Sequence, residues 1–127
     1  MDSFRKTLEN LRAGVALAAA REPDVLTVTG LVSLFEICFE QSWKAMKKTL
    51  HAHGFLEARS GSPRAIIKLA YREGMIRDEQ SWLNMLDDRS RGVHTYNEAV
   101  AEQIAAAVPE YVQQFEQLLN VLNADWS

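Results

Sequence analysis

Apolar residues recur along nearly the whole chain at three- and four-residue intervals, which is the period of an amphipathic helix. The first such segment, about Ser3 to Ala20, ends at the sequence Glu22-Pro23-Asp24, which interrupts a helix. The last segment carries an apolar face made of Val100, Ile104, Val108, Tyr111, Phe115, Leu118 and Leu122. No segment alternates with the period of two that is typical of a strand, so the pattern predicts helices throughout.

A long central segment is apolar around most of its circumference. It begins between Asp24 and Leu31 and ends near His53, where Gly54 is a typical helix stop. Its polar residues form one narrow face of Glu36, Glu40, Lys44 and Lys48. A helix of this kind is covered on more than one side, which predicts a homodimer or higher homo-oligomer built mainly on the central and last helices.

Some polar and aromatic residues of this pattern could carry chemistry, but each has a simpler structural interpretation. Glu36 and Glu40 could act as paired catalytic carboxylates, although a solvated face that Lys44 completes is favoured. Trp43 and Trp82 lie among apolar residues and are predicted to anchor the core.

Turn and cap residues divide the rest of the chain. Ser62-Pro63 predicts the start of a short helix that stops at Gly74, and Asp78 caps the next helix. The sequence Thr95-x-x-Glu98 predicts a capping box for the last helix, which Pro109 is expected to kink. The only long loop is expected at 55–61. The predicted fold is all-α: an antiparallel up-and-down bundle of about five helices in a single domain, residues 1–127.

Composition and charge narrow the classes of protein that fit. A chain of 127 residues that is 47% hydrophobic can build one core, and we expect no membrane span, no signal peptide and a cytoplasmic location. Cys38 is the only cysteine, which predicts a core thiol in a reducing compartment. No Cys/His cluster has the spacing of a zinc site, and His51 and His53 are interpreted as helix-terminal residues. We expect no metal and no cofactor. The net charge of −3 argues against a nucleic-acid coat protein.

Charge is nevertheless distributed unevenly. Between Lys44 and His94 there are ten Lys or Arg and six Asp or Glu, whereas five acids and no Lys or Arg follow His94. This asymmetry predicts a charged partner or a self-complementary surface.

The segment whose residues are best suited to catalysis is Asp88-Arg89-Ser90-Arg91-Gly92-Val93-His94-Thr95-Tyr96. Arg89 continues the apolar face of its helix, where a charge needs a partner or a cleft. Gly92 is expected to bend the chain and bring His94 back towards Arg89. A guanidinium that binds phosphate and an imidazole that moves a proton suffice for metal-free attack of a ribose 2′-hydroxyl on its neighbouring phosphodiester.

Structural alternatives remain open for the same residues. Arg89 could pair with Asp88 or with an acid of the last helix, and His94 could be a turn residue bonded to the backbone. Tyr96 could be an ordinary aromatic at a helix start.

Several motifs in this order resemble one family, the small helical HEPN proteins, and specifically their nucleotidyltransferase substrate-binding branch, also described as HepT-like toxins. The resemblance covers most of the chain. It rests on Phe35-Glu36-x-x-Phe39-Glu40-x-x-Trp43-Lys44, Ser62-Pro63-Arg64, Gly74-Met75-Ile76, Trp82-Leu83-x-Met85-Leu86-x-Asp88-Arg89 and His94-Thr95-Tyr96-Asn97-Glu98.

The resemblance implies a dimerising helical bundle encoded beside a minimal nucleotidyltransferase. Arg89 and His94 would form a metal-independent endoribonuclease site, and the partner would neutralise the toxin by adding AMP to Tyr96. Asp88, Ser90 and Arg91 are the candidate substrate contacts, with Ser90 in the place of the Asn that is usual in close relatives. The alternative is a non-catalytic subunit that binds nucleotide or substrate for the nucleotidyltransferase. Basic residues proposed to guide an RNA substrate are Arg59, Arg64, Lys68, Arg72, Arg77 and Arg91.

Overall fold

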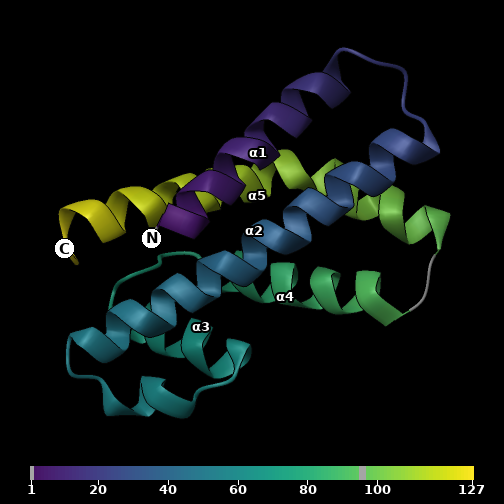
Figure 1. Cartoon of the computed structure of the whole chain (residues 1–127). Coiled ribbons are helices and arrows are strands. Elements are labelled where there is room, and N and C mark those ends of the chain that lie inside the picture. The colour runs from purple at the N-terminus through teal and green to yellow at the C-terminus, as the bar shows by residue number, and fades with distance from the viewer. Residues whose placement is uncertain (1, 95–96) are drawn as a thin grey trace.

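The computed structural model of the chain describes residues 2–94 and 97–127, with the side chains of 92–94 left aside. This part contains five α-helices, one short 3-10 helix and no strand: α1 (Asp2–Ala19), α2 (Val25–Ala52), η1 (Leu56–Ser60), α3 (Pro63–Arg72), α4 (Glu79–His94) and α5 (Glu98–Ala124). The long helices α1, α2, α4 and α5 alternate in direction along the chain, while η1 and α3 lie beside one end of α2 (Figure 1). The predicted all-α class and helix number are confirmed.

Side-chain caps fix where the helices begin. The Asp24 carboxylate accepts a hydrogen bond of 2.6 Å from the backbone N–H three residues later, which settles the start that the sequence left open. Ser62 caps α3 in the same way at 3.3 Å, as predicted. At α5 the prediction is wrong, because Asn97 and not Thr95 is the N-cap. The Asn97 amide oxygen accepts from the next two helical N–H groups at 2.9 and 3.2 Å.

Two glycines terminate helices through a left-handed backbone conformation. Gly54 and Gly74 have φ of +93° and +78°, directly after the C-caps of α2 and α3. The expected loop between α2 and α3 is largely folded into η1. Pro109 lies inside α5, which continues through it from Glu98 to Ala124.

An aromatic cluster joins four of the helices. Phe4 of α1 packs edge-on against Phe115 of α5, and Trp82 of α4 does the same at a centroid distance of 5.6 Å. Phe39 of α2 lies 6.4 Å from Trp82. All four side chains are almost completely buried, so this cluster fixes α4 against both α2 and α5. This packing fixes the orientation of α4 and so positions the residues that follow Trp82 on this helix.

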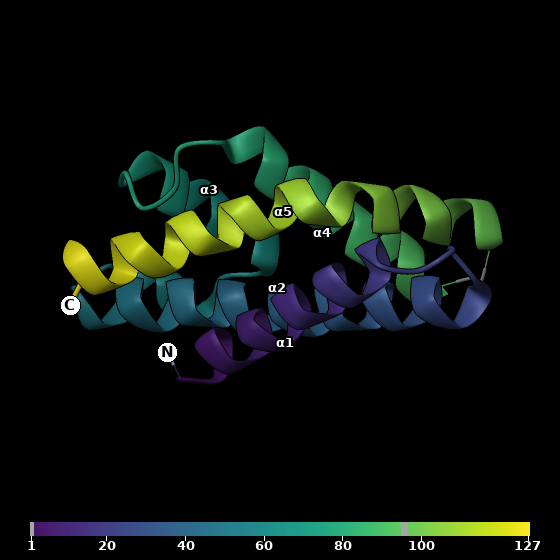
Figure 2. The same ribbon diagram turned by 90° about the horizontal axis from the view of Figure 1, so that it is seen from above.

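The central helix α2 contacts every other helix of the described chain, and Figure 2 shows it lying lengthwise beside α1. Against the expectation of no membrane span, α2 is the one helix among the described residues that is long and apolar enough for one. Among its apolar side chains, Phe35, Cys38 and Met46 are fully buried in the protein core, whereas Leu26 and Ile37 are exposed. Burial raises the pKa of the Cys38 thiol to about 12, as expected for an inert core residue.

Candidate functional site

Arg89 reaches from α4 to α2, where its Nη2 donates a hydrogen bond of 2.9 Å to Oε2 of Glu40. The Arg89 side chain is 31% exposed and that of Glu40 is 30% exposed, so the pair is half-buried. The partner is therefore neither Asp88 nor an acid of α5, the two alternatives that the sequence offered. Sequence reasoning missed Glu40 because its role depends on how α2 and α4 face each other.

The Glu40 carboxylate is shared by three donors. Besides Arg89, the Trp43 indole Nε1–H donates to the same Oε2 at 3.2 Å, and the Lys44 Nζ pairs with Oε1 at 3.6 Å. A guanidinium carries five N–H donors, and the bond to Glu40 is the only hydrogen bond of Arg89 to described residues. Glu40 thus holds the guanidinium in place and leaves further donors for an anion.

Glu36 lies one turn before Glu40 and also faces Arg89. Its Oε2 is buried and has no hydrogen-bond partner among the described residues. Burial raises the pKa of Glu36, and the positive charge of Arg89 opposes that rise. The predicted solvated face is therefore wrong for Glu36 and Glu40, which are half-buried, although Lys44 completes their row as expected.

Three predicted substrate contacts lie on the other side of α4. Asp88, Ser90 and Arg91 line an open hollow of about 600 Å³ together with Tyr111 of α5, and Arg89 is not part of that lining. The Tyr111 hydroxyl donates to Oδ2 of Asp88 at 2.5 Å. Arg91 donates to Oδ1 of Asp88 at 3.4 Å and to Gln103 of α5 at 3.0 Å.

The chain itself therefore occupies both oxygens of the Asp88 carboxylate, whose side chain is 15% exposed. Burial and the bond to Asp88 raise the pKa of the Tyr111 hydroxyl, which keeps it a proton donor. Ser90 and Arg91 also line this hollow, and their role as substrate contacts stays a prediction.

The expected bend at Gly92 is absent, because α4 runs without interruption to His94. Positions five residues apart on a continuous helix differ by about 140° around its axis. The backbone of α4 therefore does not direct positions 89 and 94 to one point. The side chain of His94, and Tyr96 as a whole, lie outside the described residues, so their predicted roles stay predictions.

Most of the basic residues proposed to guide RNA are paired with carboxylates. The pairs are Arg64 with Asp87 at 3.6 Å, Lys68 with Glu79 at 4.0 Å, Arg72 with Glu57 and Glu73, and Arg91 with Asp88. Within the described part of the chain, Arg59 and Arg77 have no such partner.

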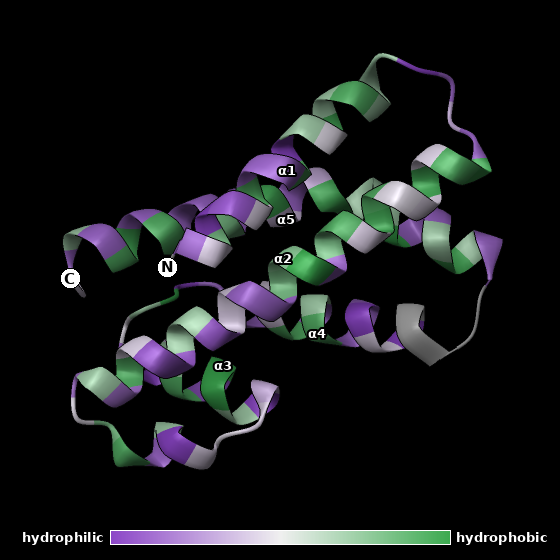
Figure 3. Cartoon of the chain, viewed as in Figure 1, coloured by the Kyte–Doolittle hydropathy of each residue, from purple (hydrophilic) through white to green (hydrophobic). Residues whose placement is uncertain are grey.

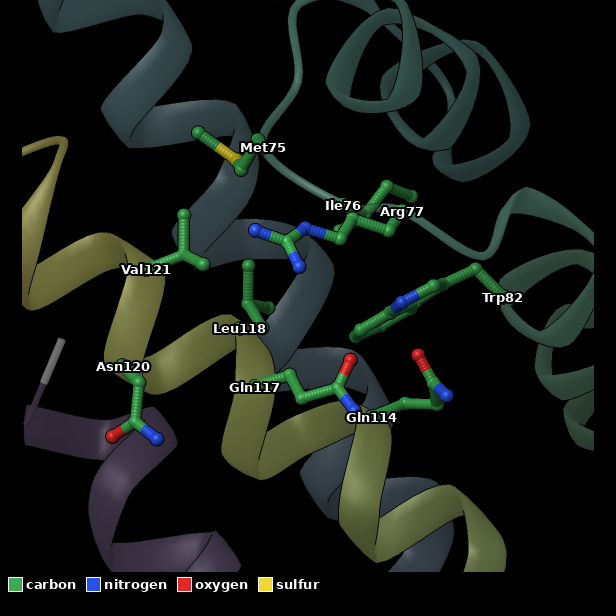
Figure 4. Close-up of a pocket in the computed structure, with 9 residues that line it drawn as sticks. All are labelled: Met75, Ile76, Arg77, Trp82, Gln114, Gln117, Leu118, Asn120 and Val121. Atoms are coloured by element: carbon green, nitrogen blue, oxygen red, sulfur yellow. The ribbon is translucent and has the colours of Figure 1, made fainter.

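Arg77 belongs to a smaller hollow of about 200 Å³ between α5 and the segment that precedes α4. Figure 4 shows its guanidinium above Leu118, with the carboxamides of Gln114 and Gln117 towards the Trp82 ring. The Trp82 side chain is almost fully buried, so this hollow is a packing seam with amide groups at its rim. Over the residues described, no group of three or more His, Cys, Asp or Glu is placed to hold a metal ion.

Comparison with known proteins gives one family and one fold. The family model described as "nucleotidyltransferase substrate binding protein like" matches residues 1–124. A crystal structure of a Thermus thermophilus protein is 36% identical, with a TM-score of 0.83 over 94% of this chain and 98% of that chain. No curated protein matches.

A second similar structure comes from Haemophilus influenzae and is described as revealing the fold of a substrate binding domain of a nucleotidyltransferase. It is 23% identical, with a TM-score of 0.85 over 96% of this chain and 98% of that chain. At this identity the likeness shows the fold.

Proposed function

The chain belongs to the family of nucleotidyltransferase substrate binding proteins, and from this premise we propose that it is the substrate-binding subunit of a nucleotidyltransferase encoded nearby. Arg89 contacts a phosphate group of the bound substrate. The observation that carries this role is the half-buried guanidinium that Glu40 holds at 2.9 Å while the rest of its donors have no partner among the described residues.

Substrate binding requires fewer precisely positioned groups than catalysis does. It needs a positioned cation at the surface, which Arg89 supplies. General acid–base catalysis needs a second group aimed at the same phosphate, and the continuous α4 turns position 94 away from position 89. These two observations favour the substrate-binding interpretation over the ribonuclease interpretation.

Reconstitution with the cognate nucleotidyltransferase tests the proposal. The two proteins are mixed with ATP labelled at the α-phosphate and with a small-molecule cell extract as the source of acceptors. We expect a stable complex and label in small-molecule products that depends on this chain. Arg89→Ala should form the complex and lose the transfer, whereas Arg12→Ala, which removes an exposed cation elsewhere, should retain both. Failure to form a complex, or full transfer with Arg89→Ala, contradicts the proposal.

Endoribonuclease activity is the second candidate, because Arg89 and His94 are the two residue types that this chemistry needs. Cleavage would need no metal and would leave a 2′,3′-cyclic phosphate. The activity should persist in EDTA and fall at least ~100-fold in His94→Ala, because general acid–base groups typically contribute that much. Incorporation of label from ATP into the wild-type chain, but not into the Tyr96→Phe variant, would identify a toxin that its partner inactivates.

We also propose that a second copy covers part of the apolar surface of α2. Leu26 is 83% exposed and Ile37 is 51% exposed, which is unusual for large aliphatic side chains. Light scattering at micromolar concentration should give the mass of a dimer, and a stable monomer would contradict this arrangement.

A further inference from the structure

A third hollow, of about 420 Å³, lies where the C-terminal half of α2 meets η1. Figure 3 shows hydrophilic residues alternating with hydrophobic ones along this part of α2. We call it the basic hollow, because its lining is Trp43, Lys44, Lys47, Lys48, His51, Ala58 and Arg59, with no carboxylate. Arg89 and Glu40 do not line it, although Trp43 and Lys44 of its lining also contact the Glu40 carboxylate that holds Arg89.

The positive charge in the basic hollow is not balanced by the chain. Among the described residues, Lys47, Lys48 and Arg59 have no carboxylate within 4.0 Å. The neighbouring acid Glu57 is already paired with Arg72. Clustered cations without counter-charges create a local potential that attracts an anion.

The helix dipole does not account for this cluster. Its stabilisation of cations is confined to the last turn of a helix. In α2 the last turn contains His51 as its basic residue, whereas Lys47 and Lys48 precede that turn. Arg59 comes from η1, a separate element, and adds its charge to the same lining.

Trp43 gives the basic hollow an aromatic wall with a fixed orientation. Its Nε1–H is bonded to Glu40 at 3.2 Å, and the Lys47 Nζ lies 5.9 Å from the centre of its ring. The ring is half-buried, and the buried methyl of Ala58 lies beside it in the lining. An aromatic face next to several cations matches a planar base joined to phosphates.

We propose that the basic hollow binds a nucleotide, with its base on the Trp43 ring and its phosphates on Lys47, Lys48 and Arg59. This goes beyond the substrate contact at Arg89, because it is a separate site on α2 and η1. The cluster of unpaired basic residues extends no further than Arg59, because the next basic residues, on α3, are paired with carboxylates. That extent fits one free nucleotide, although a nucleotide within single-stranded RNA shares the same chemistry.

Calorimetric titration of the whole protein with ATP tests the proposal. Lys48→Ala combined with Arg59→Ala removes two exposed cations and should weaken ATP binding at least ~10-fold, because each charged contact to phosphate typically contributes a factor of that size. Arg5→Ala combined with Lys6→Ala removes the same charge from the exposed face of α1 and should leave the affinity unchanged. Inorganic triphosphate should bind about 5-fold or more weakly than ATP, because it has no base to stack.

One further variant and one further ligand distinguish this site from the Arg89 site and a free nucleotide from RNA. Arg89→Ala should bind ATP as the wild type does, so loss of the Arg89 function and loss of the basic hollow are distinguishable. An octa-adenylate that binds through Lys48 and Arg59 while ATP does not would support the site with RNA as its source. Absence of saturable binding of either ligand, or equal affinity of the wild type and the Lys48/Arg59 variant, would overturn the proposal.

Discussion

Replacing Glu40 by glutamine tests the contact that positions Arg89. Glutamine keeps the shape and can still accept from the Trp43 indole, but it removes the charge opposite the Arg89 guanidinium at 2.9 Å. Both side chains are about 30% exposed. The pair therefore lies between exposed ion pairs, worth about 0–1 kcal/mol, and buried ones, which cost about 3–5 kcal/mol to break. We expect Glu40→Gln to lower the free energy of unfolding by about 1.5–2 kcal/mol.

The assay is urea unfolding of Glu40→Gln, Arg89→Gln and the double variant, followed by circular dichroism. Two residues in direct contact should show a coupling free energy of about 1 kcal/mol or more. The control cycle uses Arg12 and Glu116, an ion pair of 3.4 Å between α1 and α5 whose side chains are both 44% exposed. Its coupling should stay below about 0.5 kcal/mol. A coupling between Glu40 and Arg89 no larger than that of the control would refute the reasoning.

Three further predictions test the packing around the site. Tyr111→Phe removes the 2.5 Å bond to Asp88 but keeps the stacking on Phe35, so it should cost about 1–2 kcal/mol in unfolding free energy; an unchanged urea midpoint would contradict the bond. Burial raises the pKa of Glu36 above 4.5, so its ionised form destabilises the fold at neutral pH. Glu36→Gln should therefore raise the thermal midpoint at pH 7 and lose this advantage as the pH falls through the raised pKa of Glu36 towards 4.5, and a loss of stability at pH 7 would contradict the burial. Gly74→Ala should cost about 1 kcal/mol, because residue 74 has a φ of +78°, and an equally stable variant would show that α3 ends differently.

The parts of the fold that depend on short-range signals could be predicted from the sequence. Ser62-Pro63 and Gly74 bound α3 through contacts within a few residues, and the structure bears them out. The cap of α5 was wrong because Thr95 and Asn97 are both suitable residue types, and only the path of the chain selects between them.

The candidate site depends on which helix faces meet, and that information is not local. The half-buried position of Arg89 followed from its place in the apolar pattern of α4, but its partner did not. Glu40 is indistinguishable from a solvated residue until α2 and α4 are packed together. Gly92 could either bend or continue a helix, and its cost of about 1 kcal/mol relative to Ala does not end α4, which continues to His94.

The central claim is that the Arg89 guanidinium contacts a phosphate group of the substrate. Arginine side-chain NMR tests it directly, by following the Nε–Hε signal of Arg89 during titration with inorganic phosphate, with Lys48 and Arg59 replaced by alanine to disable the basic hollow. Arg89→Lys assigns the signal. The account predicts a saturable shift of the Arg89 signal while that of Arg12 stays in place. An Arg89 signal that does not move, or that moves only as much as that of Arg12, would contradict it.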